Sequence, residues 1–123
     1  MYIQDWSEQD KQALLMAITE ACIYEPIDVW AVGSYVYGNP RPDSDIDIVV
    51  HVDNNTRTKQ SHTNIVWRDT AVNIRYKNIK DKTDLVLGCL LSHYSLTTGE
   101  YVPGDKEQEQ QFIIKTKKYA DNT

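Results

Sequence analysis

The most informative part of the chain is residues 33–50, which read GSYVYGNPRPDSDIDIVV. An apolar run at 27–32 comes directly before it and predicts a strand that ends at Gly33 and Ser34. Glycine allows the backbone to turn sharply and to approach a ligand closely. If a short helix begins here, its free N–H groups and the Ser34 hydroxyl point to one place, and that arrangement suits a phosphate group.

Two aspartates follow at the start of a second predicted strand, residues 45–52. Because side chains alternate between the two faces of a strand, Asp45 and Asp47 should project from the same face. Neighbouring carboxylates repel each other unless a cation lies between them, and Mg²⁺ is a hard cation that prefers oxygen ligands and is often shared with phosphates. An exposed aspartate pair beside an ordinary turn is the simpler alternative. The glycine, the serine and both aspartates in this order favour a phosphate site next to a magnesium site.

This segment resembles the signature of minimal nucleotidyltransferases of the DNA polymerase beta superfamily. The matching residues are Gly33, Ser34, Gly38, Ser44, Asp45 and Asp47. The resemblance implies that the glycines and serines bind the nucleotide, with Gly33 and Ser34 at the β- and γ-phosphates, and that the aspartates hold Mg²⁺. It also implies that an acceptor hydroxyl attacks the α-phosphate of a nucleoside triphosphate, with ATP as the first candidate, and releases pyrophosphate.

The family usually carries a third carboxylate on a later strand, and this chain departs from that pattern. On the predicted strand 71–77, Asn73 and Arg75 should face the site, and Asn73 stands where the third carboxylate is expected. Asparagine can offer a carbonyl oxygen to a metal but cannot act as a base. Asp69 has the same parity but lies about 13 Å away along an extended strand. Arg75 is interpreted as a partial replacement for the positive charge of the lost metal, as a phosphate contact, or as an ordinary surface arginine.

Two functions therefore remain open. The first is an enzyme that transfers a nucleoside monophosphate to a hydroxyl of a protein or nucleic acid, with Asp45, Asp47 and Asn73 at the catalytic centre. For this reading the resemblance implies a protein partner such as a HEPN-type ribonuclease toxin. The second is a nucleotide-binding or regulatory module that has lost the chemistry. A folded domain with a vestigial site and only a protein partner is a third alternative. The segment 93–105, HYSLTTGEYVPGD, also resembles small uncharacterised phage and bacterial members of the superfamily.

Composition limits the other function classes. The chain has 123 residues, which predicts one domain over 1–123, and a net charge of −5, which argues against general nucleic-acid binding. No apolar run reaches the length of a membrane span, and the polar start and two unpaired cysteines favour a cytoplasmic setting. The three histidines lack zinc-ligand spacing and are interpreted as incidental polar residues.

The order of predicted elements indicates an α+β fold, with a small mixed sheet and helices packed on one side. Helices are expected at 5–22, 80–91 and 107–119, a hairpin at 63–68 and 71–77, and a loop at 92–105.

Overall fold

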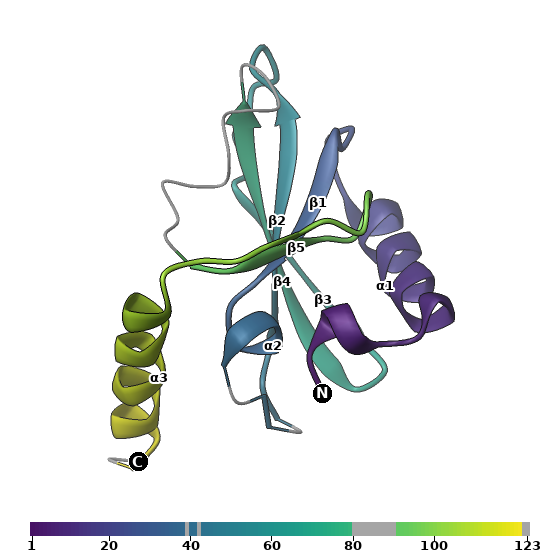
Figure 1. Ribbon diagram of the computed structural model, residues 1–123. Helices are drawn as coiled ribbons and strands as arrows, with labels where there is room; N and C mark the ends of the chain where they lie inside the picture. Colours follow the sequence, from purple (N-terminus) through teal and green to yellow (C-terminus); the bar gives the residue numbers. More distant parts are fainter. Residues whose placement is uncertain (39, 42, 80–90, 122–123) are drawn as a thin grey trace.

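The computed structural model describes residues 1–38, 40–41, 43–79 and 91–121, and it has the α+β fold that the sequence predicts. A six-stranded mixed sheet forms the centre, and helices flank it (Figure 1). The elements are η1 (Ile3–Asp5), α1 (Glu8–Ala21), β1 (Asp28–Val32), α2 (Ser34–Tyr37), β2 (Ile46–Asp53), β3 (His62–Trp67), β4 (Thr70–Ile79), β5 (His93–Ser95), β6 (Tyr101–Val102) and α3 (Lys106–Asp121).

The strands lie in the order β3-β4-β2-β1-β5-β6. The β2–β4 pair is parallel, and every other neighbouring pair is antiparallel. This order places the end of β1 beside the start of β2, so that Val32 is paired with Asp47. It also places Asn73 of β4 beside Asp47, on the other side of β2. The strands β1 and β2, which flank the sequence motif, are therefore adjacent to each other, and β4 with Asn73 lies directly beside β2.

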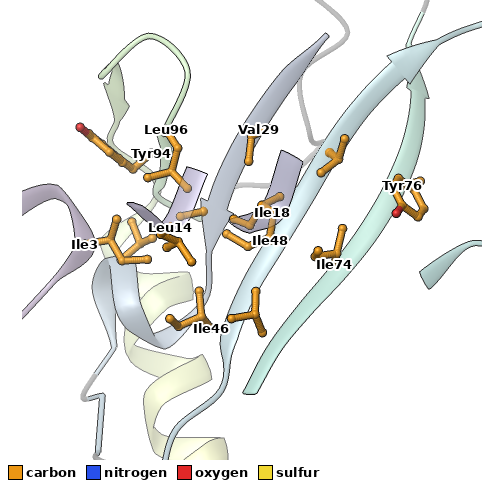
Figure 2. Close-up of a cluster of buried hydrophobic side chains, with 14 of the residues drawn as sticks. Ile3, Leu14, Ile18, Val29, Ile46, Ile48, Ile74, Tyr76, Tyr94 and Leu96 are labelled. Atoms are coloured by element: carbon orange, nitrogen blue, oxygen red, sulfur yellow. The ribbon is translucent and has the colours of Figure 1, made fainter. Parts of the chain in front are cut away.

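One face of the sheet is the hydrophobic core. On β2 the side chains of Ile46, Ile48 and Val50 point to this face, and each is at most 1% exposed. They pack against Leu14 and Ile18 of α1, which are fully buried. Figure 2 shows Leu14 and Ile18 in one cluster with Ile46 and Ile48. Because strand side chains alternate, the opposite face carries Asp47 and its cross-strand neighbours.

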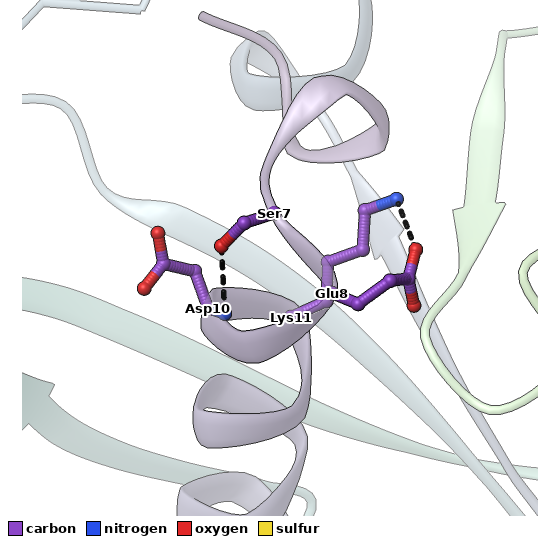
Figure 3. A network of polar contacts seen from close by, with 4 residues as sticks. All are labelled: Ser7, Glu8, Asp10 and Lys11. Atoms are coloured by element: carbon purple, nitrogen blue, oxygen red, sulfur yellow. Dashed lines mark hydrogen bonds and ion pairs between the residues drawn. The ribbon is translucent and has the colours of Figure 1, made fainter.

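The N-terminus of α1 is capped by Ser7. The Ser7 hydroxyl accepts a hydrogen bond from the Asp10 backbone N–H at 3.2 Å, and Lys11 pairs with Glu8 at 3.3 Å one turn along (Figure 3). The cap satisfies a helix N–H that has no acceptor within the helix. The helix consequently begins at Glu8, later than the predicted start at residue 5, and the preceding residues form the short turn η1.

The hairpin of β3 and β4 is confirmed, and so is the last helix, with shifts at the ends. Arg68, predicted as the end of a strand, instead forms the turn with Asp69, and both have positive φ angles of 49° and 62°. The predicted helix 80–91 lies outside the described residues except for Leu91, which is not helical.

The predicted loop at 92–105 is wrong, because it contains the β5–β6 hairpin at the edge of the sheet. The two strands have three and two residues, too few for a periodic pattern to be recognised. Within the described part of the chain, no helix has the length and apolar character needed to cross a membrane.

Candidate functional site

The turn after β1 is shaped by two glycines. Gly33 has φ 78° and ψ −154°, a conformation that favours glycine, and its carbonyl accepts hydrogen bonds from the N–H groups of Val36 and Tyr37. Gly38 closes the turn by donating its N–H to the Ser34 carbonyl at 3.0 Å. A Cβ on Gly38 would lie only 2.7 Å from the Cα of Ser34. Both glycines of the motif are therefore required by the backbone itself.

The carboxylate of Asp47 lies against this turn. A Cβ on Gly33 would be 2.7 Å from Asp47 Oδ2, so only glycine leaves room for the carboxylate. Asp45 directly precedes β2 and is exposed. The side-chain amide of Asn73 donates a hydrogen bond to Asp45 Oδ2 at 3.1 Å, and Asn73 is also the cross-strand neighbour of Asp47. Asp45, Asp47 and Asn73 are thus gathered at one point beside Gly33.

The electrostatics of this point favour a cation. Burial raises the pKa of Asp47, and the charge of Asp45 raises it further. A hydrogen bond from Asn73 and the charge of Arg75 oppose these effects without cancelling them. Burial and the neighbouring like charge both disfavour the ionised form of a carboxylate. A cation that binds between the two carboxylates therefore stabilises their ionised forms.

The donor set fits Mg²⁺ that is shared with phosphates. Mg²⁺ is commonly held by one or two carboxylates together with substrate phosphates, and Asp45 and Asp47 provide two. Asn73 adds an amide whose oxygen becomes available when the side-chain amide is turned round. Among the described residues no group of three or more His, Cys, Asp or Glu side chains could hold a metal. Asp69 lies in the hairpin turn and does not join the pair.

A cavity of about 260 Å³ opens on the same face. Its lining residues are Val32, Gly33, Tyr37, Asp47, Ile48, Val49, His62, Asn73, Ile74, Arg75 and Leu91. Arg75 is exposed at its rim, one alternation along β4 from Asn73. His62 was not expected here. The cross-strand pair that it forms with Arg75 could have revealed it, because paired residues share a face.

A larger hollow of about 500 Å³ lies elsewhere, beside η1 and the β3–β4 turn, and Asp47 and Gly33 are not among its lining residues. Trp6 stacks on Trp67 there at 5.8 Å between ring centroids, and Tyr35 meets the edge of Trp6 at 6.1 Å. Size alone would select this hollow, but it lacks the carboxylate pair. The smaller cavity is therefore the candidate site.

Ser34 and Ser44 are both expected to bind the nucleotide, but their surroundings differ from each other. Ser34 begins α2 directly after Gly33 and is half-buried, so its hydroxyl lies at the turn that the motif predicts. The hydroxyl of Ser44 instead accepts a hydrogen bond from the Arg41 backbone N–H at 2.8 Å, and the Ser44 N–H donates to the Arg41 carbonyl. In this arrangement Ser44 shapes the approach to Asp45, and a nucleotide contact by Ser44 remains a prediction.

Two histidines that were interpreted as incidental are buried on the face that carries Asp47. His51 and His93 are each 2% exposed, and both rings lie near Trp30, with the His93 ring edge-on at 4.9 Å between centroids. Burial lowers the pKa of His51. These residues form part of the interior beside the site.

Comparison with protein families gives one match. The family model for the nucleotidyltransferase domain matches residues 16–119, which include Gly33, Ser34, Asp45, Asp47 and Asn73. The searches of curated proteins and of solved structures found no match. Since the matched range covers most of the 123 residues, the chain belongs to the nucleotidyltransferase domain family.

Proposed function

We propose that this chain is a magnesium-dependent nucleotidyltransferase that transfers a nucleoside monophosphate from a nucleoside triphosphate to a hydroxyl group. ATP is the first candidate for the donor, and a protein or nucleic acid is the acceptor. The observation that carries the proposal is the contact between the Asp47 carboxylate and the Gly33 turn, with Asp45 joined to the same point through Asn73. A phosphate cradle and a carboxylate pair at one point suit a triphosphate with its metal.

The residues have separate tasks in this reaction. The turn at Gly33 and the Ser34 hydroxyl donate hydrogen bonds to the outer phosphates. Asp45 and Asp47 hold Mg²⁺, which neutralises charge on the triphosphate when bound. Arg75, which lines the same cavity, adds positive charge there. The acceptor oxygen bonds to the α-phosphorus as the bond to the leaving pyrophosphate breaks, so that positioning and charge account for most of the catalysis.

A second function is favoured by one specific observation, the amide at Asn73. An amide cannot take a proton from the acceptor, and among the described residues no third carboxylate joins the pair. A module that binds nucleotide without transferring it is consistent with this. Both functions share the binding step and differ in turnover.

The experiment separates the two functions. The purified chain is incubated with Mg²⁺ and each of the four nucleoside triphosphates labelled at the α-phosphate. The acceptors are the chain itself, an RNA oligonucleotide with a free 3′ hydroxyl, and a peptide that contains Ser, Thr and Tyr. Transfer of label with pyrophosphate release, lost in Asp45→Asn and in Asp47→Asn, supports the transferase. Magnesium-dependent binding without label transfer supports the module. If neither label transfer nor magnesium-dependent binding occurs, both the transferase and the binding module are contradicted.

The partner follows only from the family resemblance, whereas the location rests on the two cysteines, which the sequence gives no reason to pair. A HEPN-type ribonuclease toxin is the proposed protein partner, and a cytoplasmic setting is proposed with it. Co-expression with such a toxin, followed by co-purification and a search for a nucleotide mass added to the toxin, tests this part separately. A toxin that neither co-purifies with the chain nor gains mass would contradict it.

A further inference from the structure

We infer that His62 is the general base for the acceptor hydroxyl, in place of the carboxylate that Asn73 replaces. This inference rests on the proposed transferase function and deepens it. It concerns a residue that lies outside the sequence motif, on the neighbouring hairpin strand β3. It would explain how a chain with an amide at position 73 transfers a nucleotide.

The sheet register brings His62 to the site. His62 is paired with Arg75 of β4, and Arg75 is paired with Val49 of β2, so these three side chains share one face. Asp47 lies two residues before Val49 and therefore on the same face. His62 and Asp47 both line the cavity of about 260 Å³. An acceptor group in this cavity would lie between the histidine and the carboxylate pair.

Of the residues that line this cavity, few can accept a proton. Asp47 is assigned to the metal, Asn73 is an amide, and Arg75 has no acceptor atom. Tyr37 carries a phenol, but it is only 8% exposed. His62 is exposed to the solvent from which an acceptor arrives. Imidazole is the side chain used most often for proton transfer near neutral pH.

The imidazole and its backbone are held in place by neighbouring groups. Nδ1 of His62 lies 2.7 Å from the Ser61 hydroxyl, which leaves Nε2 as the ring nitrogen available to an acceptor. The Gln60 side-chain amide donates to the His62 carbonyl at 2.9 Å. Tyr24 in turn anchors Gln60, because its hydroxyl and the Gln60 backbone exchange hydrogen bonds of 3.1 Å. A base is effective when such neighbours fix its orientation.

The proposed step makes one bond to the α-phosphorus and breaks another. The acceptor oxygen forms a bond to the α-phosphorus, and the bond between the α-phosphorus and the bridging oxygen of pyrophosphate breaks. The acceptor proton moves to Nε2 of His62 and then to solvent, with Nδ1–H donating to Ser61. Pyrophosphate carries away the electron pair of the broken bond. No further reactant is needed.

The test compares His62→Ala and His62→Gln with the wild type, and Val66→Thr is the matched control. Val66 is on the same strand and face and is 74% exposed, so this change alters β3 without touching the cavity lining. Pyrophosphate release from Mg-ATP is measured with the RNA oligonucleotide and the peptide described above. Binding of Mg-ATP is measured by calorimetry, and folding by thermal melting.

We expect both His62 variants to release pyrophosphate at least about 100-fold more slowly, with Mg-ATP affinity and melting unchanged. Added imidazole should restore part of the rate to His62→Ala and should have no such effect on the wild type or on Val66→Thr. An active wild type whose rate is unchanged in His62→Ala would overturn this inference and leave the proposed function standing. A wild type that releases no pyrophosphate with any acceptor would overturn the transferase function, and with it the role of His62.

Discussion

The Asp47 carboxylate lies so close to the Gly33 backbone that a Cβ at residue 33 would stand 2.7 Å from Asp47 Oδ2. The turn that suits phosphate and the carboxylate that suits a metal are thereby joined by direct contact. The pairing of Val32 with Asp47 fixes this contact, since it aligns the end of β1 with the start of β2. A change at either residue should therefore affect both binding functions.

We expect Gly33→Ala to weaken both stability and nucleotide binding. The φ angle of 78° is strained for alanine, and the added methyl group would displace the Asp47 carboxylate. The strain alone should cost about 1–3 kcal/mol of unfolding free energy. Urea unfolding and calorimetric titration with Mg-ATP measure the two effects.

Gly99→Ala is the matched control for that change. Gly99 has a similar φ of 80°, but a Cβ there would meet only the Tyr94 hydroxyl, at 3.8 Å. It should lose comparable stability and retain Mg-ATP binding. Unchanged binding in Gly33→Ala would contradict the proposed link between the turn and the carboxylate.

We expect Asp47→Asn to stabilise the free protein at neutral pH while weakening nucleotide binding. Burial raises the pKa of Asp47 above the ordinary value of 3.8, so its ionised form opposes folding. This penalty is absent below pH 3.8, grows as the pH rises toward the folded-state pKa, and is complete above it. The melting temperature of the variant should therefore exceed that of the wild type at pH 7 and approach it in acid.

Affinity for Mg-ATP should fall at least about 10–100-fold in the same variant. Loss of a residue that only hydrogen-bonds to a metal ligand already lowers metal affinity by such a factor. Thermal melting across pH and calorimetry with Mg-ATP check the two parts. A lower melting temperature at pH 7 would show that Asp47 stabilises the free fold, contrary to this account.

We expect Asn73→Asp to make stability depend on magnesium. The new carboxylate replaces an amide that donates to Asp45, so three like charges would meet and the free protein should melt at a lower temperature. Mg²⁺ should reverse the loss, and nucleotide transfer should rise by at least about tenfold. Melting curves in MgCl₂ and in EDTA, together with pyrophosphate release, test this. The same decrease in melting temperature in MgCl₂ and in EDTA would argue against a metal bound between these carboxylates.

We expect Leu14→Ala to destabilise the fold by about 2–5 kcal/mol, because Leu14 is fully buried between α1 and the sheet. Met16 on the same helix is 60% exposed and serves as the control, with Met16→Ala expected within about 0.5 kcal/mol of the wild type. Urea unfolding measures both. Equal effects would mean that α1 does not pack as described.

The centre of the fold and its motif were predictable because they depend on local patterns. The alternation on β2 and β4 placed Ile48 and Ile74 in the core and Asp47 and Asn73 on the other face. The hydrogen bond from the Asp10 N–H to the Ser7 hydroxyl is local in the same sense, because the two residues are only three apart.

The features that were missed depend on contacts between distant residues. The strands β5 and β6 are too short to show a period, and Ser95 is buried because it pairs with Trp30, more than sixty residues away in sequence. His62 lines the cavity because the β3–β4 register pairs it with Arg75, thirteen residues further along the chain. Hydrophobic periodicity carries no information about either relationship.

We propose that the Gly33 turn and the two aspartates form one site for a magnesium-bound triphosphate, and calorimetric titration measures that binding. ATP is titrated into the wild type with Mg²⁺ and again with EDTA, and then into the variant Asp45→Asn/Asp47→Asn with Mg²⁺. We expect one binding event that requires both Mg²⁺ and the aspartates. Binding of equal strength in EDTA or in the double variant, or no binding of any nucleoside triphosphate, would contradict it.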